Sequence, residues 1–492
     1  MDLPQDFKER MKSQLGDSCH EFFAAYEQER VFGLRCNPLK IDSARLTALL
    51  LKQGIWLEPV EWAAEGFYYP PDAQPGKLAL HEAGAYYIQE PSAMTAAALL
   101  DPQPGEKILD LCAAPGGKST QIAARMSGRG LLVSNETVPQ RAKILSRNIE
   151  RMGIVNAAVL NETPKRLAER FPLFFDRILA DAPCSGEGMF RKDENARAEW
   201  SLESTVFCAK RQREILAQAV RMLKPGGILV YSTCTFAPAE NEETAEWLVK
   251  EYPELTMEYS GQIWPHLSRG EGHYTARFRR EGGSHSAYLC REGIDFESET
   301  AYSDRRKKCK VTESGMKYPG GMESHKQKTD NKSKPPGSRK KHRQESGTDM
   351  KEGMQILAQF LKDTLSEKTE AVILQQIQSG RLAAFGEQLY LLPPEIASLE
   401  GLKTERAGLQ LGCCRKSRFE PSHALAMALR PEDVKQVLEL QEPERYIRGE
   451  ALPCGGQKGW TLITVEGCSI GWGKAAAGIM KNHYPKGLRR DW

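Results

Sequence analysis

The sequence predicts an α/β protein whose central domain is a doubly wound parallel β-sheet. Two observations predict this fold class. Short apolar segments alternate with amphipathic helical segments from about Tyr86 to Arg291, and a glycine-rich turn joins the first apolar strand to a helix. The chain has 492 residues, and at roughly 150 residues per domain this length suggests about three domains. We therefore expect smaller domains on either side of the sheet.

The composition is typical of a globular protein outside the membrane, with 40% hydrophobic and 27% charged residues. The longest apolar run, residues 93–100, is far shorter than the ~20 residues that a bilayer requires. The N-terminal segment alternates charged and apolar residues and lacks the apolar core of a signal peptide. The 12 cysteines show no regular spacing, so neither a disulfide framework nor a metal site is expected. We expect a cytoplasmic protein with reduced thiols and no bound metal, and we assume a monomer.

Residues 1–85 predict a small α/β domain. A helical opening is followed by a strand-like segment at residues 31–40 and a helical segment at residues 43–54. The apolar residues of the last segment recur at helical spacing.

Residues 86–292 predict the sheet itself. Five apolar segments predict strands, at residues 107–112, 130–136, 156–162, 177–183 and 227–234. Amphipathic segments between or beside them predict helices, at residues 117–126, 139–153 and 210–224. Strands that alternate with helices in this way form parallel sheets with helices on both faces.

Residues 293–350 predict a basic, flexible linker. The part from 301 to 350 holds 14 Lys and Arg against 6 Asp and Glu, and Val311 is its one Ile, Leu, Val or Phe. Such a segment buries too little apolar surface to offset the entropy of ordering. Two functions stay open for it, an electrostatic tether for nucleic acid and a solvated linker without a partner.

The remaining chain predicts a helical connection followed by a β-rich module. Residues 351–384 show the spacing of one or two amphipathic helices. Residues 385–492 contain short apolar strands separated by glycines. We expect a small, mostly β domain at this end of the chain.

The turn after the first predicted strand suggests a ligand site. Gly116 and Gly117 permit close approach of a ligand to the backbone, and the helix that follows presents unpaired N–H groups. Glu136 ends the next strand, where a carboxylate reaches ribose hydroxyls. The turn matches neither the dinucleotide pattern nor the ATP pattern, so we expect another nucleoside cofactor, with a plain tight turn as the alternative.

Two further strand ends carry reactive side chains. Asp181 and Cys184 follow one apolar segment, and Cys234 ends another. Because the carboxyl ends of parallel strands share one edge of a sheet, all three are expected near the glycine-rich turn. Either cysteine taken singly fits a small buried hydrophobe, whereas the combination favours a catalytic site.

These motifs resemble those of a known family. Residues 112–118, 181–186 and 232–235 look like the signature motifs of the Sun/Fmu family of RNA 5-methylcytosine methyltransferases. Other segments are similar to the N-terminal part of that family or to its bacterial subgroup that methylates 16S ribosomal RNA, namely residues 35–40, 87–94, 265–280, 445–450, 471–474 and 481–489.

The resemblance implies a class I, Rossmann-like methyltransferase sheet with an RNA-binding-like N-terminal domain and a PUA-like RNA-binding domain at residues 385–492. It implies S-adenosylmethionine as cofactor, with contacts from Cys112, Ala113, Ala114, Pro115, Gly116, Gly117, Lys118, Glu136, Glu162 and Asp181. It also implies ribosomal RNA as partner, 16S rRNA of the small subunit or its precursor. The alternatives are 23S rRNA or tRNA with the same chemistry, or a non-catalytic RNA-binding assembly factor.

The resemblance also assigns catalytic roles. Carbon 5 of cytosine is a poor nucleophile until a thiolate adds to carbon 6, and the family places this attack on Cys234. Cys184 would then assist loss of the carbon 5 proton and release of the product. Asp181 would hydrogen-bond to nitrogen 3 or, in its protonated form, act as an acid there. Lys118 would place positive charge near Cys234 or the cofactor carboxylate, with a solvent-facing lysine at the start of the helix as the alternative.

Several basic residues and one histidine lie outside these motifs. Arg35, Lys40, Arg191, Lys192, the basic linker and the C-terminal segment 481–490 are candidates for a phosphate path, with a solvated surface as the alternative. His273 could lie on a late strand near the site, but we expect a packed or solvent-facing histidine and do not count it as a site residue.

Overall fold

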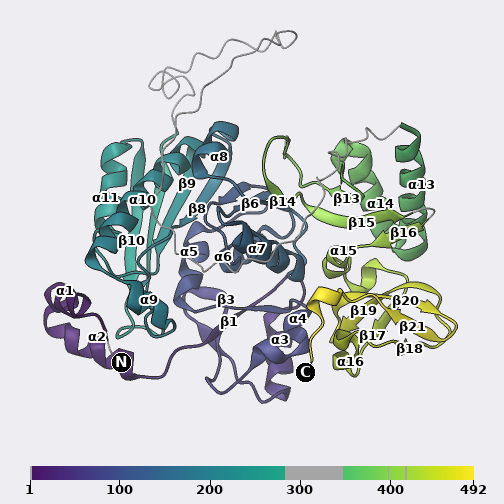
Figure 1. Cartoon of the computed structure of the whole chain (residues 1–492), viewed down its shortest axis with the longest axis horizontal. Helices are drawn as coiled ribbons and strands as arrows, with labels where there is room; N and C mark the ends of the chain where they lie inside the picture. The colour runs from purple at the N-terminus through teal and green to yellow at the C-terminus, as the bar shows by residue number, and fades with distance from the viewer. Residues whose placement is uncertain (1–2, 283–346, 397, 416–417, 492) are drawn as a thin grey trace, which may run out of the picture. The chain divides into compact units, whose positions relative to one another are not determined.

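The computed structural model describes residues 3–282, 347–396, 398–415 and 418–491. Apart from residues 347–350, the predicted linker lies outside these ranges. An eight-stranded sheet forms the centre, with strand order β10-β11-β9-β8-β5-β6-β7-β14 (Figure 1). Each described cysteine is a free thiol. In the described part of the chain, no helix has the length and apolarity that a membrane span needs.

The N-terminal part is a four-stranded antiparallel sheet with helices. Its helices are α1 (Gln5–Leu15), α2 (Cys19–Glu27), α3 (Ser43–Lys52) and α4 (Ala79–Glu82). Its strands, in the order β2-β3-β1-β4, are β1 (Gly33–Cys36), β2 (Glu58–Val60), β3 (Ala63–Tyr68) and β4 (Tyr86–Ile88). The last strand pairs with β1 and lies beyond residue 85, so this sheet extends past the predicted boundary.

The five predicted strands of the central sheet are present. They are β5 (Lys107–Asp110), β6 (Leu131–Asn135), β7 (Ala157–Leu160), β8 (Phe175–Asp181) and β9 (Leu223–Thr233), all parallel to their neighbours in this set. Three antiparallel strands complete the sheet, namely β10 (Leu255–Ile263), β11 (His273–Arg280) and β14 (Thr404–Arg406). The sheet is therefore mixed, and β14 joins it from the region predicted as the C-terminal module.

Alternating side chains of the central strands face two helical layers. Leu109 and Val133 belong to a core formed with α8 (Pro164–Arg170), α10 (Leu202–Met222) and α11 (Glu242–Glu251). Ile108 and Leu132 belong to the core on the other face, formed with α5 (Thr95–Leu100), α6 (Gly117–Met126) and α7 (Pro139–Arg151). Neighbouring residues of a strand point to opposite faces, so these apolar runs are buried on both sides, as a doubly wound sheet requires.

The C-terminal region contains two further sheets. Helices α13 (Gly347–Thr364) and α14 (Glu367–Gln376) precede a sheet of β12 (Leu382–Phe385), β13 (Gln388–Leu391), β15 (Leu409–Arg415) and β16 (Arg418–Pro421). The second sheet contains β17 (Val437–Glu439), β18 (Leu452–Pro453), β19 (Gly459–Val465), β20 (Cys468–Ala476) and β21 (Ile479–Asn482). Two short helices, α15 (His423–Ala428) and α16 (Pro443–Arg448), accompany these strands. The predicted β-rich character of this region is confirmed.

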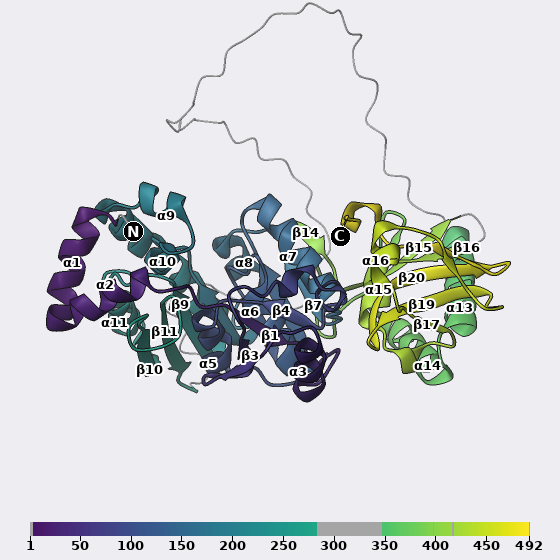
Figure 2. The same cartoon turned by 90° about the horizontal axis from the view of Figure 1, so that it is seen from below.

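The first two helices pack on the loops that follow β8 and β9. Phe7 of α1 and Phe22 of α2 form an aromatic cluster with Phe190, Trp200 and Phe236, near α9 (Glu194–Glu199) (Figure 2). Aromatic side chains bury large areas and lock such contacts. The N-terminal helices therefore support the loops at the carboxyl edge of the sheet.

A buried ion pair reinforces this contact. Both guanidinium ends of Arg10 donate to the carboxylate of Glu187, at 2.8 and 2.6 Å, and the Glu187 side chain is fully buried. Trp200 Nε1 and the backbone N–H of Phe236 donate to the same carboxylate. The buried charge is thus satisfied by donors from three separate segments.

We expect the substitution Arg10→Ala to lower the free energy of unfolding by about 3 kcal/mol, because it leaves the Glu187 charge buried without its cation. Chemical denaturation would measure this loss. The matched control is Arg445→Ala, since the Arg445 pairs with Glu442 and Glu450 are largely exposed and worth at most about 1 kcal/mol. Equal losses in both variants would contradict a structural role for the buried pair.

Candidate active site

The site lies where the strand order reverses. Strands β5 and β8 are neighbours in the sheet, although two strand and helix units separate them in the chain. The crevice outside the carboxyl ends at such a switch point is where doubly wound sheets bind ligands. The glycine-rich turn follows β5, and the segment with Asp181 and Cys184 follows β8.

The turn after β5 is shaped for close approach. Gly116 precedes α6 with φ +116°, a left-handed conformation that glycine adopts without strain. No side chain caps the start of this helix, so its first N–H groups face the turn. Asn148 and Arg141 of α7 donate to the carbonyl oxygens of Pro115 and Ala114, each at 2.9 Å. These two hydrogen bonds therefore fix the conformation of the turn relative to α7.

Arg35 also holds this turn, which corrects its predicted placement on a phosphate path. Its buried guanidinium donates to the carbonyl of Gly117 at 2.9 Å and to Thr120 Oγ1 at 2.7 Å. Lys40 donates to Ser469 Oγ at 2.7 Å, and burial lowers the Lys40 pKa to about 7. Neither residue is placed to contact RNA phosphates.

Arg191 does not fit the path either, because its side chain is only 5% exposed and pairs with Glu271 at 2.7 Å. Lys192 is exposed. Lys192 is thus the exposed residue among these four. The C-terminal segment of the predicted path also presents exposed lysines, Lys481 and Lys486, and the linker part lies outside the described residues apart from residues 347–350.

Asp181 connects the turn to β8 and β9, the two strands that precede Cys184 and Cys234. Lys118 Nζ donates to Asp181 Oδ2 and Ser232 Oγ donates to Asp181 Oδ1, both at 2.8 Å. Burial alone would raise the pKa of Asp181, but the Lys118 charge and these hydrogen bonds outweigh it and hold the pKa below its usual range. The ionised form of Asp181 is therefore favoured in the free protein, and the predicted role of Asp181 at nitrogen 3, which requires the bound base, stays a prediction.

Cys184 and Cys234 are brought together. Their Sγ atoms are 3.4 Å apart, close enough for one thiol to donate to the other. The hydrogen bond with Cys234, followed by burial and the charge of Cys234, raises the pKa of Cys184 well above its ordinary value. One of the two sulfurs can carry a charge while the other keeps its proton.

Glu240, which the sequence analysis missed, braces the Cys184 segment. Its carboxylate accepts from the backbone N–H of Ser185 at 3.0 Å and from Gln212 Nε2 at 2.8 Å, and Ser185 Oγ also donates to it. Gln212 in turn donates to the carbonyl of Pro183 at 3.0 Å. Glu240 thus fixes the backbone on both sides of the Cys184 thiol.

His273, at the start of β11, lies beside Asp181. Its side chain is only 2% exposed, and Nε2 is 3.7 Å from Asp181 Oδ1. Burial and then the Lys118 charge lower the His273 pKa to about 3, so this ring is neutral. His273 is therefore a packed histidine, which is one of the two placements expected from the sequence. It also contacts the site through Asp181.

A pocket of about 230 Å³ lies beside the turn. Residues that follow β5, β6, β7 and β8 contribute Cys112, Thr137, Thr163 and Pro183 to its lining, and α10 contributes Ile215. The pocket thus runs along the carboxyl edge of four parallel strands.

The two carboxylates predicted to bind cofactor are buried near this edge. Glu136 accepts from the backbone N–H of Val138 at 2.9 Å and pairs with Arg141 at 3.2 Å. Glu162 accepts from the backbone N–H of Lys403 at 2.8 Å. Both carboxylates therefore have partners within the described part of the chain.

Models of protein families match four segments. Residues 97–279 match 16S rRNA methyltransferase RsmB/F, and residues 3–91 match the N-terminal domain of 16S rRNA methyltransferase RsmF. Residues 359–429 match the first C-terminal domain of RsmF, and residues 435–490 match its PUA domain. Ribosomal RNA small subunit methyltransferase F of Vibrio vulnificus (strain YJ016) is 30% identical over 517 residues, covering 99% of this chain and 98% of that protein.

The chain belongs to the RsmF family. The enzyme of the same name from Klebsiella pneumoniae (strain 342) is 31% identical, covering 99% of this chain and 97% of its own. Among solved structures, a methyltransferase homologue from Pyrococcus horikoshii is 28% identical with a TM-score of 0.51, covering 56% of this chain and 95% of that one. The structure of NSun6 from Pyrococcus horikoshii with SFG is 21% identical, with a TM-score of 0.52. It covers 56% of this chain and 98% of its own, and it shares the fold.

We expect Glu240→Gln to lower the rate of methyl transfer by about tenfold to a hundredfold, because an amide cannot accept from all three donors and the Cys184 segment shifts. Initial rates would measure this loss. The matched control is Glu243→Gln, an exposed neighbour.

The same pair of variants tests the charge of Glu240. Burial raises the Glu240 pKa to about 7 from 4.5, so the folded chain holds this proton more tightly than the unfolded chain. The stability of the wild type relative to Glu240→Gln should fall as the pH rises from about 5 to about 8. A flat difference would contradict the raised pKa.

Proposed function

We propose that this RsmF-family protein transfers a methyl group from S-adenosylmethionine to carbon 5 of cytosine in 16S rRNA, through a covalent bond between Cys234 and carbon 6. The observation that carries the proposal is the pair of thiols 3.4 Å apart next to the Lys118–Asp181 ion pair. A nucleophile, a second proton-transfer group and a paired charge are the groups that this reaction needs.

The residues around the turn fit the cofactor. The pocket lined by Cys112 and Thr137 follows the strand ends. Gly116 is buried against Leu145 and Gly117 is half-buried against Gln89, so the two glycines let the turn pack closely on its neighbours. Asp110 Oδ1 is buried with no hydrogen-bond partner among the described residues, which favours an additional polar group at this turn. When bound, S-adenosylmethionine supplies an electrophilic methyl group.

In the first step the Cys234 sulfur adds to carbon 6 of the cytosine, and negative charge develops on the ring. The Lys118 ammonium is the group that can stabilise this charge, and its ion pair with Asp181, which Ser232 also bonds, holds it in place. Carbon 5 becomes the nucleophile that takes the methyl group. Because Asp181 is ionised in the free protein, Lys118 rather than Asp181 holds the proton of this pair when the base arrives.

The second step removes the carbon 5 proton and breaks the bond between sulfur and carbon 6. Once Cys234 is bonded to the base, it no longer carries charge or accepts the Cys184 hydrogen bond. The largest cause of the raised Cys184 pKa, the hydrogen bond with Cys234, and the charge of Cys234 are then removed, while burial remains. Cys184 can then lose its own proton to solvent water and, as a thiolate, accept the carbon 5 proton, so that the electrons of the C–H bond restore the ring double bond and Cys234 leaves as a thiolate.

The target cytosine has to be unstacked, because carbon 6 inside a duplex is hidden from a thiol. We place the reaction in the cytoplasm and on a monomeric enzyme. The same chemistry on 23S rRNA or tRNA, and a non-catalytic role in assembly, are the outcomes that the experiments below separate.

Substitution of each thiol should separate the two roles. Cys234→Ala should reduce methyl transfer roughly a thousandfold or more and form no adduct, because the nucleophile is lost. Cys184→Ala should accumulate a covalent RNA adduct, visible on a denaturing gel, because release is blocked. Cys208→Ala is the control thiol on α10. An adduct found in the Cys234 variant alone would reverse the assignment.

Bisulfite sequencing of total RNA should identify the substrate. In a strain that lacks the gene, at least one cytosine of 16S rRNA should lose its protection from conversion. The wild-type gene should restore protection, and Cys234→Ala should not. Loss confined to 23S rRNA or tRNA would contradict the choice of substrate, and unchanged protection at every cytosine would contradict the enzymatic function.

A further inference from the structure

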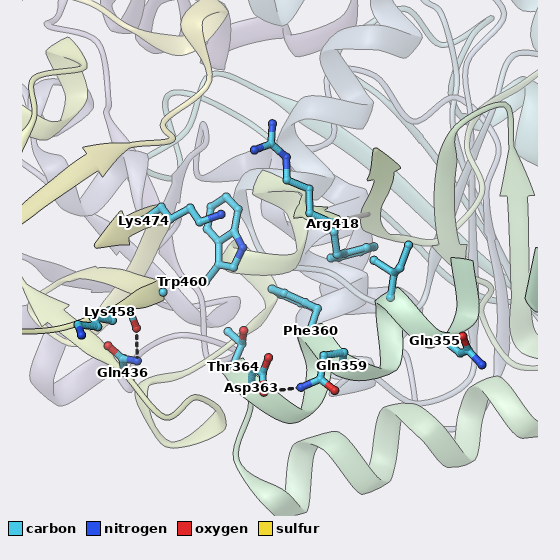
Figure 3. Close-up of a pocket in the computed structure, with 13 residues that line it drawn as sticks. Gln355, Gln359, Phe360, Asp363, Thr364, Arg418, Gln436, Lys458, Trp460 and Lys474 are labelled. Atoms are coloured by element: carbon cyan, nitrogen blue, oxygen red, sulfur yellow. Dashed lines mark hydrogen bonds between the residues drawn. The ribbon is translucent and has the colours of Figure 1, made fainter. Parts of the chain in front are cut away.

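A groove of about 690 Å³ lies in the C-terminal region, apart from the candidate active site. Figure 3 shows that helix α13 forms one side, while β16 and the strands β19 and β20 contribute the other side chains. The groove is lined by Gln355, Ile356, Gln359, Phe360, Asp363, Thr364, Arg418, Phe419, Gln436, Lys458, Gly459, Trp460 and Lys474.

The floor of the groove is aromatic. Phe360 and Phe419 are buried, with ring centroids 4.7 Å apart. Trp460 is half-buried beside them, and its ring meets those of His483 and Trp472 edge to face, with centroids 4.5 and 6.3 Å away. A fixed, partly exposed indole above a packed aromatic layer is a surface on which a flat ring can lie.

The rim of the groove is basic. Arg418, Lys458 and Lys474 line it together with the carboxylate of Asp363, and Arg418 also pairs with Glu420 at 3.5 Å. Lys474 Nζ lies over the Trp460 ring, 5.1 Å from its centroid. A phosphate bound at the rim would draw this flexible ammonium off the indole and leave the ring face open to a base. Charge and aromatic surface therefore meet at one place.

Amide groups complete the lining. Gln355 and Gln359 are exposed. Gln436 donates from Nε2 to the carbonyl of Lys458 at 2.8 Å, whereas its Oε1 is buried and accepts no hydrogen bond from the described residues. Amides of this kind can bond to the edges of bases.

We propose that this groove binds an unpaired segment of the RNA substrate, an inference that rests on the proposed function. Unpaired nucleotides combine exposed base faces, which stack on aromatic rings, with phosphates, which attract lysine and arginine. A duplex hides the base faces and offers only phosphates, and an acidic polypeptide would leave the indole without a stacking partner. The groove therefore holds RNA away from the target cytosine and contributes affinity and not chemistry.

Fluorescence anisotropy on the full chain tests the proposal, with a labelled, unstructured RNA of about 12 nucleotides and a duplex of the same length. Trp460→Ala should weaken binding of the single strand roughly tenfold, and Trp460→Phe should restore most of it. Lys458→Glu should also weaken binding, whereas the matched control Lys250→Glu, an exposed lysine on α11 of the central domain, should not. Thermal unfolding of each variant would verify that the fold is intact.

Photocross-linking with thiouridine in the same RNA supplies an independent readout. Cross-linked peptides should include residues of α13 or β19. Unchanged affinity in Trp460→Ala, equal loss for duplex and single strand, or competition by polyglutamate as effective as that by RNA would each overturn the proposal. Methyl transfer by the wild type is measured in parallel. Its absence with intact Trp460-dependent binding would refute the proposed function and leave the groove assignment standing.

Discussion

The parallel pairing of β8 with β9 is the constraint on which the site depends. Asp181 lies opposite Ser232 in this register, so the segments that carry Cys184 and Cys234 leave the sheet side by side. Neighbouring strands are about 4.8 Å apart, and the two segments are tied again when the backbone N–H of Gly188 donates to the carbonyl of Cys234 at 2.8 Å. The contact between the thiols follows from this register.

Two buried carboxyl groups fix the segments that follow β8 and β9. Glu240 satisfies the backbone beside Cys184, and Glu187 joins the same loop to the loop after Cys234 and to Arg10 of α1. A buried carboxylate is costly unless donors surround it, so each of these charges holds its donors in place. The N-terminal helices are consequently part of the framework of the site and not only an appended domain.

Much of the fold and part of the site could be predicted from the sequence. The parallel strands and the glycine-rich turn leave local patterns, and both cysteines follow such strands. The residues that hold the site together leave no such pattern, because their partners are distant in the sequence. Ser185 lies 55 positions from Glu240, Arg10 lies 177 from Glu187, and Gly117 lies 82 from Arg35. Arg35 looked like a surface cation because its residue type does not reveal burial. Strand β14 is too short to show a periodic pattern and joins its sheet from more than 200 positions away, since Thr404 pairs with Leu160.

The strand order also limits where the target base can bind. The thiols belong to the β8 and β9 side of the edge, whereas the pocket beside the turn extends from β5 and β8 toward β6 and β7. Asp181 stands between them and is the point where Lys118, from the β5 side, meets Ser232, from the β9 side. In the proposed reaction, a cytosine that contacts Cys234 and receives a methyl group from the pocket would therefore lie over Asp181. The Lys118–Asp181 ion pair would then be the point that both reacting groups approach.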